Sequence, residues 1–435
     1  MTDTLDAPRL AEGVPVSAAP RPARLVLLAP LRQRPFRLLF AGQVVSNLGD
    51  WLDLLALLAL IAYQWRLGAA ALAGLTMMML LPAALVSPLA GVFVDRWPCR
   101  RVMIVCDLAR AGLALTLIWA PNVVVLLATV FTMRVFSTFF SPARQVAIRL
   151  VVPADDLLQA NALSRLSINV TKVLGPGLGG AAVLLAGPRG AFVADSVSFL
   201  MSAALLGVLR LPRPTDQTPA GHAPKRAFLA SFGRDFAGGV GYIFGTPLLA
   251  VAVGAQMAEA LLIESNDSLI VLAFKGLGMS ATVVGFAIGC SGLGNVAGAL
   301  AIGQWGGRLN PLRQMGAGKL LVGLVGGSIG MALLLGIQGD ARWFPALVVS
   351  GVGFAAIWVP FSYIVQRETP PELLGRVSAT TAALYTTTGL AGPPLGAFLA
   401  PRVGVGPVFV ITGGALALLG LLLEVLRLPA RRERT

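Results

Sequence analysis

Asp50 and Asp53 are two acidic residues, three positions apart, within a predominantly apolar segment at residues 38–63. On a helix this spacing places both side chains on one face, roughly 18 and 22 Å from the start of the segment. Two carboxylates this close repel each other when both are ionised, and burial adds to the cost, so the pair favours holding a proton. This chemistry suits a proton carrier. The alternatives are that the aspartates cap a local helix break or pair structurally with Lys172.

Further acidic residues fall in a second apolar segment, residues 247–270. Glu259 lies about as deep in this segment as Asp50 does in its own, and Glu264 and Asp267 follow toward the outer end. A charge near the centre of a membrane costs about 2.5–3.5 kcal/mol on insertion scales, so such a charge is a functional candidate by default. Glu259 is the expected counterpart of Asp50, whereas Glu264 and Asp267 are expected to line a solvated outer mouth.

The amino-acid composition indicates that these charged residues belong to a protein embedded in a lipid bilayer. Of 435 residues, 56% are hydrophobic and 12% are charged, against about 25% charged in soluble domains. A bilayer accepts apolar side chains on the outside of a fold, and each spanning helix needs about 20 residues. The pattern predicts an all-α polytopic membrane protein with twelve transmembrane helices, near residues 38–63, 71–94, 101–119, 122–141, 160–186, 190–209, 247–270, 280–303, 316–337, 343–366, 377–400 and 405–426.

Residues that carry metal or enzyme chemistry are scarce. The cysteines, Cys99, Cys106 and Cys290, are too few and too scattered for a disulfide framework or a zinc cluster. The only histidine is His222, so the sequence contains no His-Glu-x-x-His motif. We therefore expect no metal, no cofactor and no enzymatic activity.

Basic residues outnumber acidic ones by 34 to 20, for a formal net charge of +14. Cationic loops of membrane proteins stay on the cytoplasmic side and face anionic lipid. With both termini in the cytoplasm, only five basic residues fall in the opposite loops: Arg66, Arg189, Lys275, Arg342 and Arg402. The charge therefore predicts a multi-pass inner (plasma) membrane protein with both termini cytoplasmic, and membrane lipid, not nucleic acid, as its partner.

The chain repeats a pattern across its middle. Seven residues recur 217 positions later: Pro153, Asp155, Leu157, Gly175, Pro176, Leu178 and Gly179 match Pro370, Glu372, Leu374, Gly392, Pro393, Leu395 and Gly396. Transporters built from two six-helix repeats place their site between the halves. We predict two pseudo-symmetric bundles in this order: cytoplasmic arm 1–37, N-terminal six-helix bundle 38–210, cytoplasmic linker 211–235, C-terminal six-helix bundle 236–428 and cytoplasmic tail 429–435.

A motif of glycine, acidic and basic residues follows the second expected helix. Its members are Gly91, Asp95, Arg96, Arg100 and Arg101. It resembles the loop two–three signature of the major facilitator superfamily, although Pro98 and Cys99 stand where that family usually has a glycine and a basic residue. The resemblance implies that the charged members are gating residues that latch the halves in an outward-open state. The alternative is a plain cytoplasmic turn with basic anchors.

The fifth expected helix carries a second motif, whose key members are Gly175, Pro176, Gly179 and Gly180. Proline removes a helix hydrogen bond and glycine removes bulk, which creates a bend and a close-packed face. The pattern resembles the superfamily's antiporter motif, which is found mostly in exporters; the alternative is packing alone. Arg134 resembles the arginine of the family's helix-four motif, which is implicated in proton coupling. Its alternative role is that of a buried partner for an aspartate.

Several further segments are similar to the enterobactin-exporter and macrolide-efflux branch of the superfamily. They are Pro35-Phe-Arg-Leu-Leu-Phe40, Ser46-Asn-Leu-Gly-Asp-Trp51, Ser141-Pro-Ala-Arg144, Asn161-Ala-Leu163 and Gln366-Arg-Glu-Thr-Pro-Pro-Glu-Leu-Leu-Gly-Arg-Val377. The resemblance implies twelve helices, alternating access and efflux driven by the proton gradient.

We therefore expect a monomeric transporter that exports a small amphipathic molecule, of the drug or siderophore class, in exchange for protons. A lysophospholipid or nutrient transporter of the same fold is the main alternative. A ferroportin-like metal exporter is a weaker one, because soft and imidazole ligands are scarce.

Overall fold

The computed structural model describes residues 28–94, 97–153, 156–209, 225–340 and 342–426. All regular secondary structure in these ranges is helical. In a bilayer the backbone must satisfy its own hydrogen bonds, which a helix does within one segment. The all-α prediction is confirmed for this part of the chain.

The first half consists of five long helices. They are α1 (Arg34–Ala59), α2 (Ala69–Val94), α3 (Cys99–Thr116), α4 (Val123–Val151) and α5 (Leu157–Val208). A π-helical turn, Leu60–Gln64, extends α1. Local residues fix several helix starts: a proline occupies the first turn of α1, and the Asn122 side chain accepts a hydrogen bond from the backbone N–H of Val125 at the start of α4.

The helix α5 contains two membrane passes. Its 52 residues would measure roughly 78 Å as one straight helix, more than twice the thickness of a bilayer core. The helix breaks at Gly187, which has φ 67° and ψ 178°, a backbone conformation open mainly to glycine. Pro188 follows and disfavours a helical conformation at the residue before it. The break lies between the predicted helices 160–186 and 190–209.

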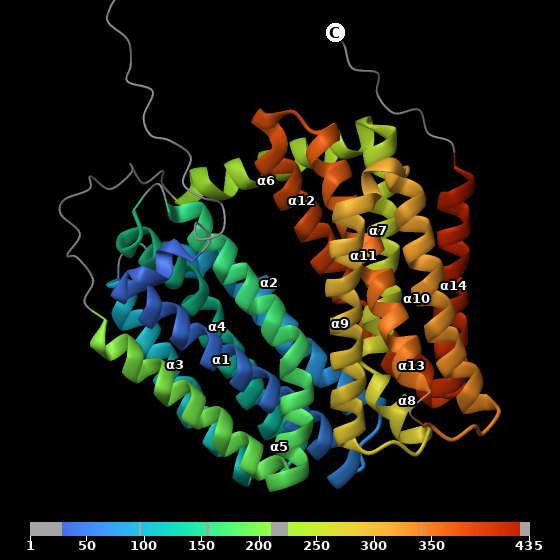
Figure 1. Ribbon diagram of the computed structural model, residues 1–435, viewed down its shortest axis with the longest axis horizontal. Coiled ribbons are helices and arrows are strands. Elements are labelled where there is room, and N and C mark those ends of the chain that lie inside the picture. Colours follow the sequence, from blue (N-terminus) through green and yellow to red (C-terminus); the bar gives the residue numbers. More distant parts are fainter. Residues whose placement is uncertain (1–27, 95–96, 154–155, 210–224, 341, 427–435) are drawn as a thin grey trace, which may run out of the picture.

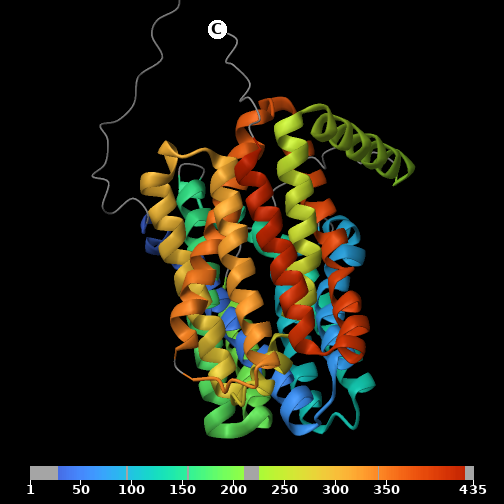
Figure 2. The same ribbon diagram turned by 90° about the vertical axis from the view of Figure 1, so that its right-hand side faces the viewer.

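The second half is built from eight helices. They are α7 (Pro247–Asp267), α8 (Ile270–Gly276), α9 (Ala281–Trp305), α10 (Pro311–Leu334), α11 (Trp343–Glu368), α12 (Pro371–Gly389), α13 (Gly392–Val403) and α14 (Val405–Val425). The helix α6 (Lys225–Gly245) precedes them and lies across one end of the molecule (Figures 1 and 2). The first residues of α6 therefore fall inside the predicted linker, whose residues 211–224 lie outside the described ranges.

The described residues contain ten helices that are long and apolar enough to cross a membrane. The count of twelve follows if α5 is taken as two passes and the consecutive helices α12 and α13 as one. Several predicted boundaries are wrong. The helix α4 continues through Pro142 to Val151 instead of ending near residue 141, and α10 and α12 begin at Pro311 and Pro371 instead of near residues 316 and 377.

The two halves meet at one end of the molecule and diverge toward the other (Figure 1). We call the first the contact end; the bend between the two passes of α5 and the link from α8 to α9 lie there. The second, the α6 end, holds α6, the start of α1 and the end of α14. The Tyr63 hydroxyl donates a hydrogen bond across the interface to the carbonyl of Met279, at 2.8 Å, and Lys275 donates one to the carbonyl of Ala62.

The buried apolar side chains follow the same division. One cluster draws residues from both halves, including Ile61 and Phe192 of the first and Phe274 of the second. Three other clusters stay within single halves, one around Met103, one around Met315 and one around Ile357. Apolar packing therefore joins the halves at the contact end.

Candidate functional site

The N-terminal half holds a network of charged side chains in its interior. Asp50 of α1 pairs with Arg134 of α4, with 3.3 Å between Oδ1 and the guanidinium Nη1. Arg110 of α3 lies 3.9 Å from the other oxygen of Asp50. Asp50 retains 29% of its side-chain exposure and Arg134 retains 20%, so this pair remains within reach of water.

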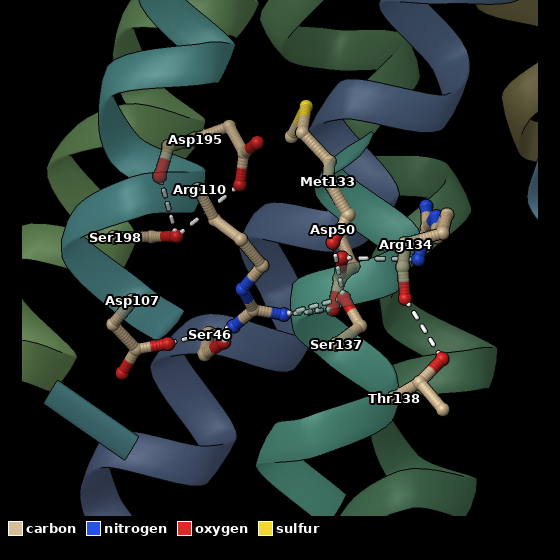
Figure 3. Close-up of polar contacts among 10 residues, drawn as sticks. All are labelled: Ser46, Asp50, Asp107, Arg110, Met133, Arg134, Ser137, Thr138, Asp195 and Ser198. Atoms are coloured by element: carbon tan, nitrogen blue, oxygen red, sulfur yellow. Dashed lines mark hydrogen bonds and ion pairs between the residues drawn. The ribbon is translucent and has the colours of Figure 1, made fainter. Parts of the chain in front are cut away.

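Arg110 joins several helices into this network (Figure 3). Its guanidinium donates to Asp107 at 2.8 Å, to Ser46 at 2.8 Å and to Ser137 at 3.1 Å. Asp107 has no exposed side-chain surface, and Arg110 has almost none. Sequence reasoning about i, i+3 spacing favours a structural pair between Asp107 and Arg110 near the membrane surface. The pair forms, but Arg110 also reaches Asp50 on α1.

Two further carboxyl groups lie next to this network. In each of them, one oxygen has no hydrogen-bond donor. Asp53 is 1% exposed and Asp195 is fully buried, and Asp53 Oδ1 and Asp195 Oδ2 have no hydrogen-bond partner. Asp195 interacts electrostatically with Asp53, Asp50, Arg110 and Arg134. The sequence analysis missed Asp195, although the rule that selected Asp50 applies to it equally, because it is an acid within an expected membrane helix.

A cavity of about 470 Å³ opens beside the network. Its lining combines one cation, three hydroxyl groups and apolar side chains: Arg134, Ser137, Thr138, Ser141, Met79, Ala83 and Pro142. Arg134 belongs both to the cavity wall and to the ion pair with Asp50. The network therefore touches a space that can hold a small molecule.

Lys172, the other candidate partner for the acids of α1, lies elsewhere. It is on the first pass of α5 and interacts electrostatically with Asp267 of α7, in the opposite half. Asp267 is exposed, and its place at an outer mouth stays a prediction. The partners of Asp50 are thus Arg134 and Arg110.

Glu259 occupies a different environment from Asp50. It forms an ion pair with Lys319 of α10, and the two side chains are 1% and 0% exposed. The sequence analysis missed Lys319 because it expected this helix to begin near residue 316. The helix begins at Pro311, which places Lys319 deeper. Because each charge is neutralised by the other inside the protein, this pair is suited to a structural role.

The loop motif after α2 is only partly described. Asp95 and Arg96 lie outside the described residues, and Gly91 is part of α2. Arg100 donates hydrogen bonds to the carbonyls of Leu206, at 2.9 Å, and Gly207. These carbonyls belong to the last turn of α5, where a cation is favourable. Arg101 lies in the first turn of α3. In this conformation Arg100 binds within its own half.

The glycine motif in α5 packs against helices on two sides. A Cβ atom at Gly179 would lie 2.7 Å from the carbonyl oxygen of Trp51 on α1, and Gly175 faces the ring of the same tryptophan. A Cβ atom at Gly180 would lie 2.9 Å from the carbonyl oxygen of Thr282 on α9, in the other half. The motif thus allows close packing within the first half and between the halves.

A serine in α10 has the Gly-x-Ser-x-Gly spacing of many hydrolases, in residues 326–330. That motif requires a sharp turn from a strand to a helix, whereas Ser328 lies inside a continuous helix and donates to the carbonyl of Val325, at 2.7 Å. The spacing here does not produce an enzyme site.

Comparison with known proteins agrees with this architecture. The sequence pattern of the Major Facilitator Superfamily matches residues 39–390 and, in a second match, residues 268–435. The chain therefore belongs to the Major Facilitator Superfamily of membrane transporters, as its motifs predicted, and it is a transporter and not an enzyme.

Relatives of similar length lie within this superfamily. An uncharacterised transporter of this type, YfiS of Bacillus subtilis, is 27% identical over 90% of this chain and 92% of its own. The enterobactin exporter EntS of Citrobacter koseri is 26% identical over 95% and 97%.

Solved structures show the same fold. A bacterial homologue of the human lysosomal transporter Spinster, inward-facing and unoccupied, superposes with a TM-score of 0.65 at 14% identity, covering 90% of this chain and 95% of its own. A bacterial homologue of the iron transporter ferroportin gives 0.64 at 14% identity, over 90% and 99%.

Proposed function

We propose that this transporter exports a small amphipathic molecule, of the drug or siderophore class, in exchange for protons. The observation that carries the proposal is the composition of the buried network in the N-terminal half. Four carboxyl groups (Asp50, Asp53, Asp107 and Asp195) accompany two guanidinium groups (Arg110 and Arg134). Burying unpaired ionised carboxylates is costly, so such a surplus favours binding protons.

The cavity supports the substrate class. Its volume, about 470 Å³, falls within the range of about 300–1,000 Å³ typical of small-molecule sites. Met79, Ala83 and Pro142 offer apolar contact, and the neighbouring hydroxyl groups offer hydrogen bonds. An amphipathic molecule needs both. The similarity to EntS, an enterobactin exporter, supports the same class.

Charge and conformation together support loading of the substrate from the cytoplasm, as export requires. The excess of basic residues favours the α6 end as the cytoplasmic side. Because the halves join at the contact end and diverge at the α6 end (Figure 1), this conformation would accept substrate from the cytoplasm. Alternating access then requires the halves to rock, which breaks contacts such as the hydrogen bond from Tyr63 to Met279 and makes new ones at the α6 end.

Arg134 connects substrate binding to protonation in this scheme. A carboxylate at Asp50 holds Arg134 in their ion pair. A proton on Asp50 removes that attraction and changes the charge that the cavity presents. Substrate and proton therefore influence each other's binding through one side chain, and such coupling is reciprocal. Glu259 is not part of the proposal, because Lys319 compensates its charge.

The proposal predicts that Asp50→Asn and Asp53→Asn uncouple transport. Each variant keeps the shape of the side chain but cannot release a proton. Since coupling free energies are typically 1–3 kcal/mol, we expect proton-driven accumulation to fall by about 5–150-fold while downhill flux persists. The measurement uses proteoliposomes with an imposed pH gradient, with enterobactin and ethidium as probes.

Asp340→Asn is the control, because Asp340 is an exposed partner of Arg342 outside the membrane helices; it should transport like the wild type. Undiminished proton-driven efflux of a transported probe in both Asp50→Asn and Asp53→Asn would refute the proposal.

A further inference from the structure

Asp195 packs directly against α1 because of a glycine on that helix. A Cβ atom at Gly49 would collide with the carboxyl group of Asp195 and with the Ser198 side chain. Asp53 lies four residues beyond Gly49, one helical turn farther on the same side of α1. The absence of a side chain at Gly49 thus brings the second pass of α5 close to α1, and it brings Asp195 into the neighbourhood of Asp53.

Each of these two carboxyl groups has one oxygen without a hydrogen-bond donor. Ser198 donates its proton to the backbone carbonyl of Asp195, at 2.7 Å, and lies 3.4 Å from the carboxyl oxygen Oδ1. Asp53 Oδ1 and Asp195 Oδ2 have no partner. Both side chains are at least 99% buried, so water does not replace the missing donors.

The cations nearby are already paired with other acids. Arg110 binds Asp107 at 2.8 Å, and Arg134 binds Asp50 at 3.3 Å. Each of these pairs has no net charge. Asp53 and Asp195 are therefore the acids that no nearby arginine neutralises. Two unpaired carboxylates in a buried site repel each other, and one proton shared between them removes most of that cost.

We propose that Asp53 and Asp195 hold one proton between them in this conformation and together form the proton-binding site of the N-terminal half. The shared proton is a property of the resting protein, but its role in transport rests on the proposed function above. Each cycle takes up one proton at this pair from one side of the membrane and releases it to the other. Asp50, which is partly exposed beside the cavity, is the route by which the proton enters or leaves.

Infrared spectroscopy tests the shared proton without any substrate. The difference spectrum of the purified protein between acidic and alkaline pH contains a carbonyl band for each buried carboxyl group that loses its proton. The charged groups that act on this pair are Asp50 of α1, Arg110 of α3 and Arg134 of α4. We expect a wild-type band that disappears in both Asp53→Asn and Asp195→Asn.

The control is Asp340→Asn, which removes an exposed acid that is paired with Arg342 outside the network and should leave the band in place. A band that survives in either Asp53→Asn or Asp195→Asn would overturn the inference.

Transport by Asp195→Asn in proteoliposomes separates this inference from the proposed function. We expect its proton-driven accumulation of ethidium or enterobactin to fall by about 5–150-fold, as for Asp53→Asn, with downhill flux retained. If the infrared band disappears but coupling is intact, the role of the pair in transport is wrong, although the proton is shared. If the wild type shows no proton-driven transport of any probe, the proposed function fails while the infrared result stands.

Discussion

Replacement of Gly180 by valine should drive the protein out of the conformation described here. A Cβ atom at this position would lie 2.9 Å from the carbonyl oxygen of Thr282 and 3.5 Å from Cα of Gly285. Both are backbone atoms of α9, so no side-chain rotation relieves the clash. Overpacking of this kind costs typically 1–3 kcal/mol. The cost falls on the conformation in which α5 and α9 touch, so the population shifts toward states in which the halves separate at the contact end.

Spin-label distances at the α6 end measure this shift. Leu158 and Leu309 are exposed, at 78% and 64%, and lie at that end of the first and second halves. Labels at Leu158→Cys and Leu309→Cys, in a background without native cysteines, should come closer together in Gly180→Val.

The control is Gly414→Val, since a Cβ atom there meets no atom within 4 Å. An unchanged distance distribution in Gly180→Val would show that the contact between α5 and α9 does not control the conformation.

Replacement of Lys319 by methionine should be among the most destabilising changes in the C-terminal half. Lys319 and Glu259 are both buried and form one ion pair. Removing one partner of a buried pair leaves an uncompensated charge, which typically costs about 3–5 kcal/mol. We therefore expect a large fall in the thermal unfolding midpoint of purified Lys319→Met in detergent.

The double variant Lys319→Met, Glu259→Met distinguishes charge from packing. Apolar residues that replace both members of a buried pair are often neutral or stabilising, so the double variant should be more stable than Lys319→Met alone. Arg342→Met, in an exposed ion pair, should leave the midpoint almost unchanged. If Lys319→Met were as stable as the wild type, the buried ion pair between Lys319 and Glu259 would not contribute to stability as described here.

Much of the fold follows from the sequence because the bilayer permits few structures. Long apolar stretches must become helices there, and the turn signals divide them correctly at Gly187, where glycine and proline break α5. Pro142 shows the limit of such signals, since α4 continues through it. A proline inside a membrane helix can be accommodated when neighbouring groups satisfy the freed backbone carbonyl.

The candidate network is predictable only in part, both in its members and in its pairings. The cost of an intramembrane charge selects Asp50, Asp53 and Arg134 from the sequence alone, and the same rule would have selected Asp195. Which acid meets which base depends on how helices far apart in the chain pack together. Lys172 lies on a helix beside the network, yet it acts on Asp267 across the interface, whereas Arg110 reaches from α3 to α1. Spacing within one helix cannot reveal such contacts.

Simultaneous recording of substrate and proton flux tests the central proposal most directly. Proteoliposomes containing the wild-type protein and an internal pH indicator are loaded with ethidium or enterobactin, and both fluxes are followed after a pH gradient is imposed. Exchange of protons for substrate in opposite directions, at a fixed ratio that Asp53→Asn abolishes, is the predicted result. Substrate flux that neither moves protons nor responds to the gradient would contradict proton-coupled export.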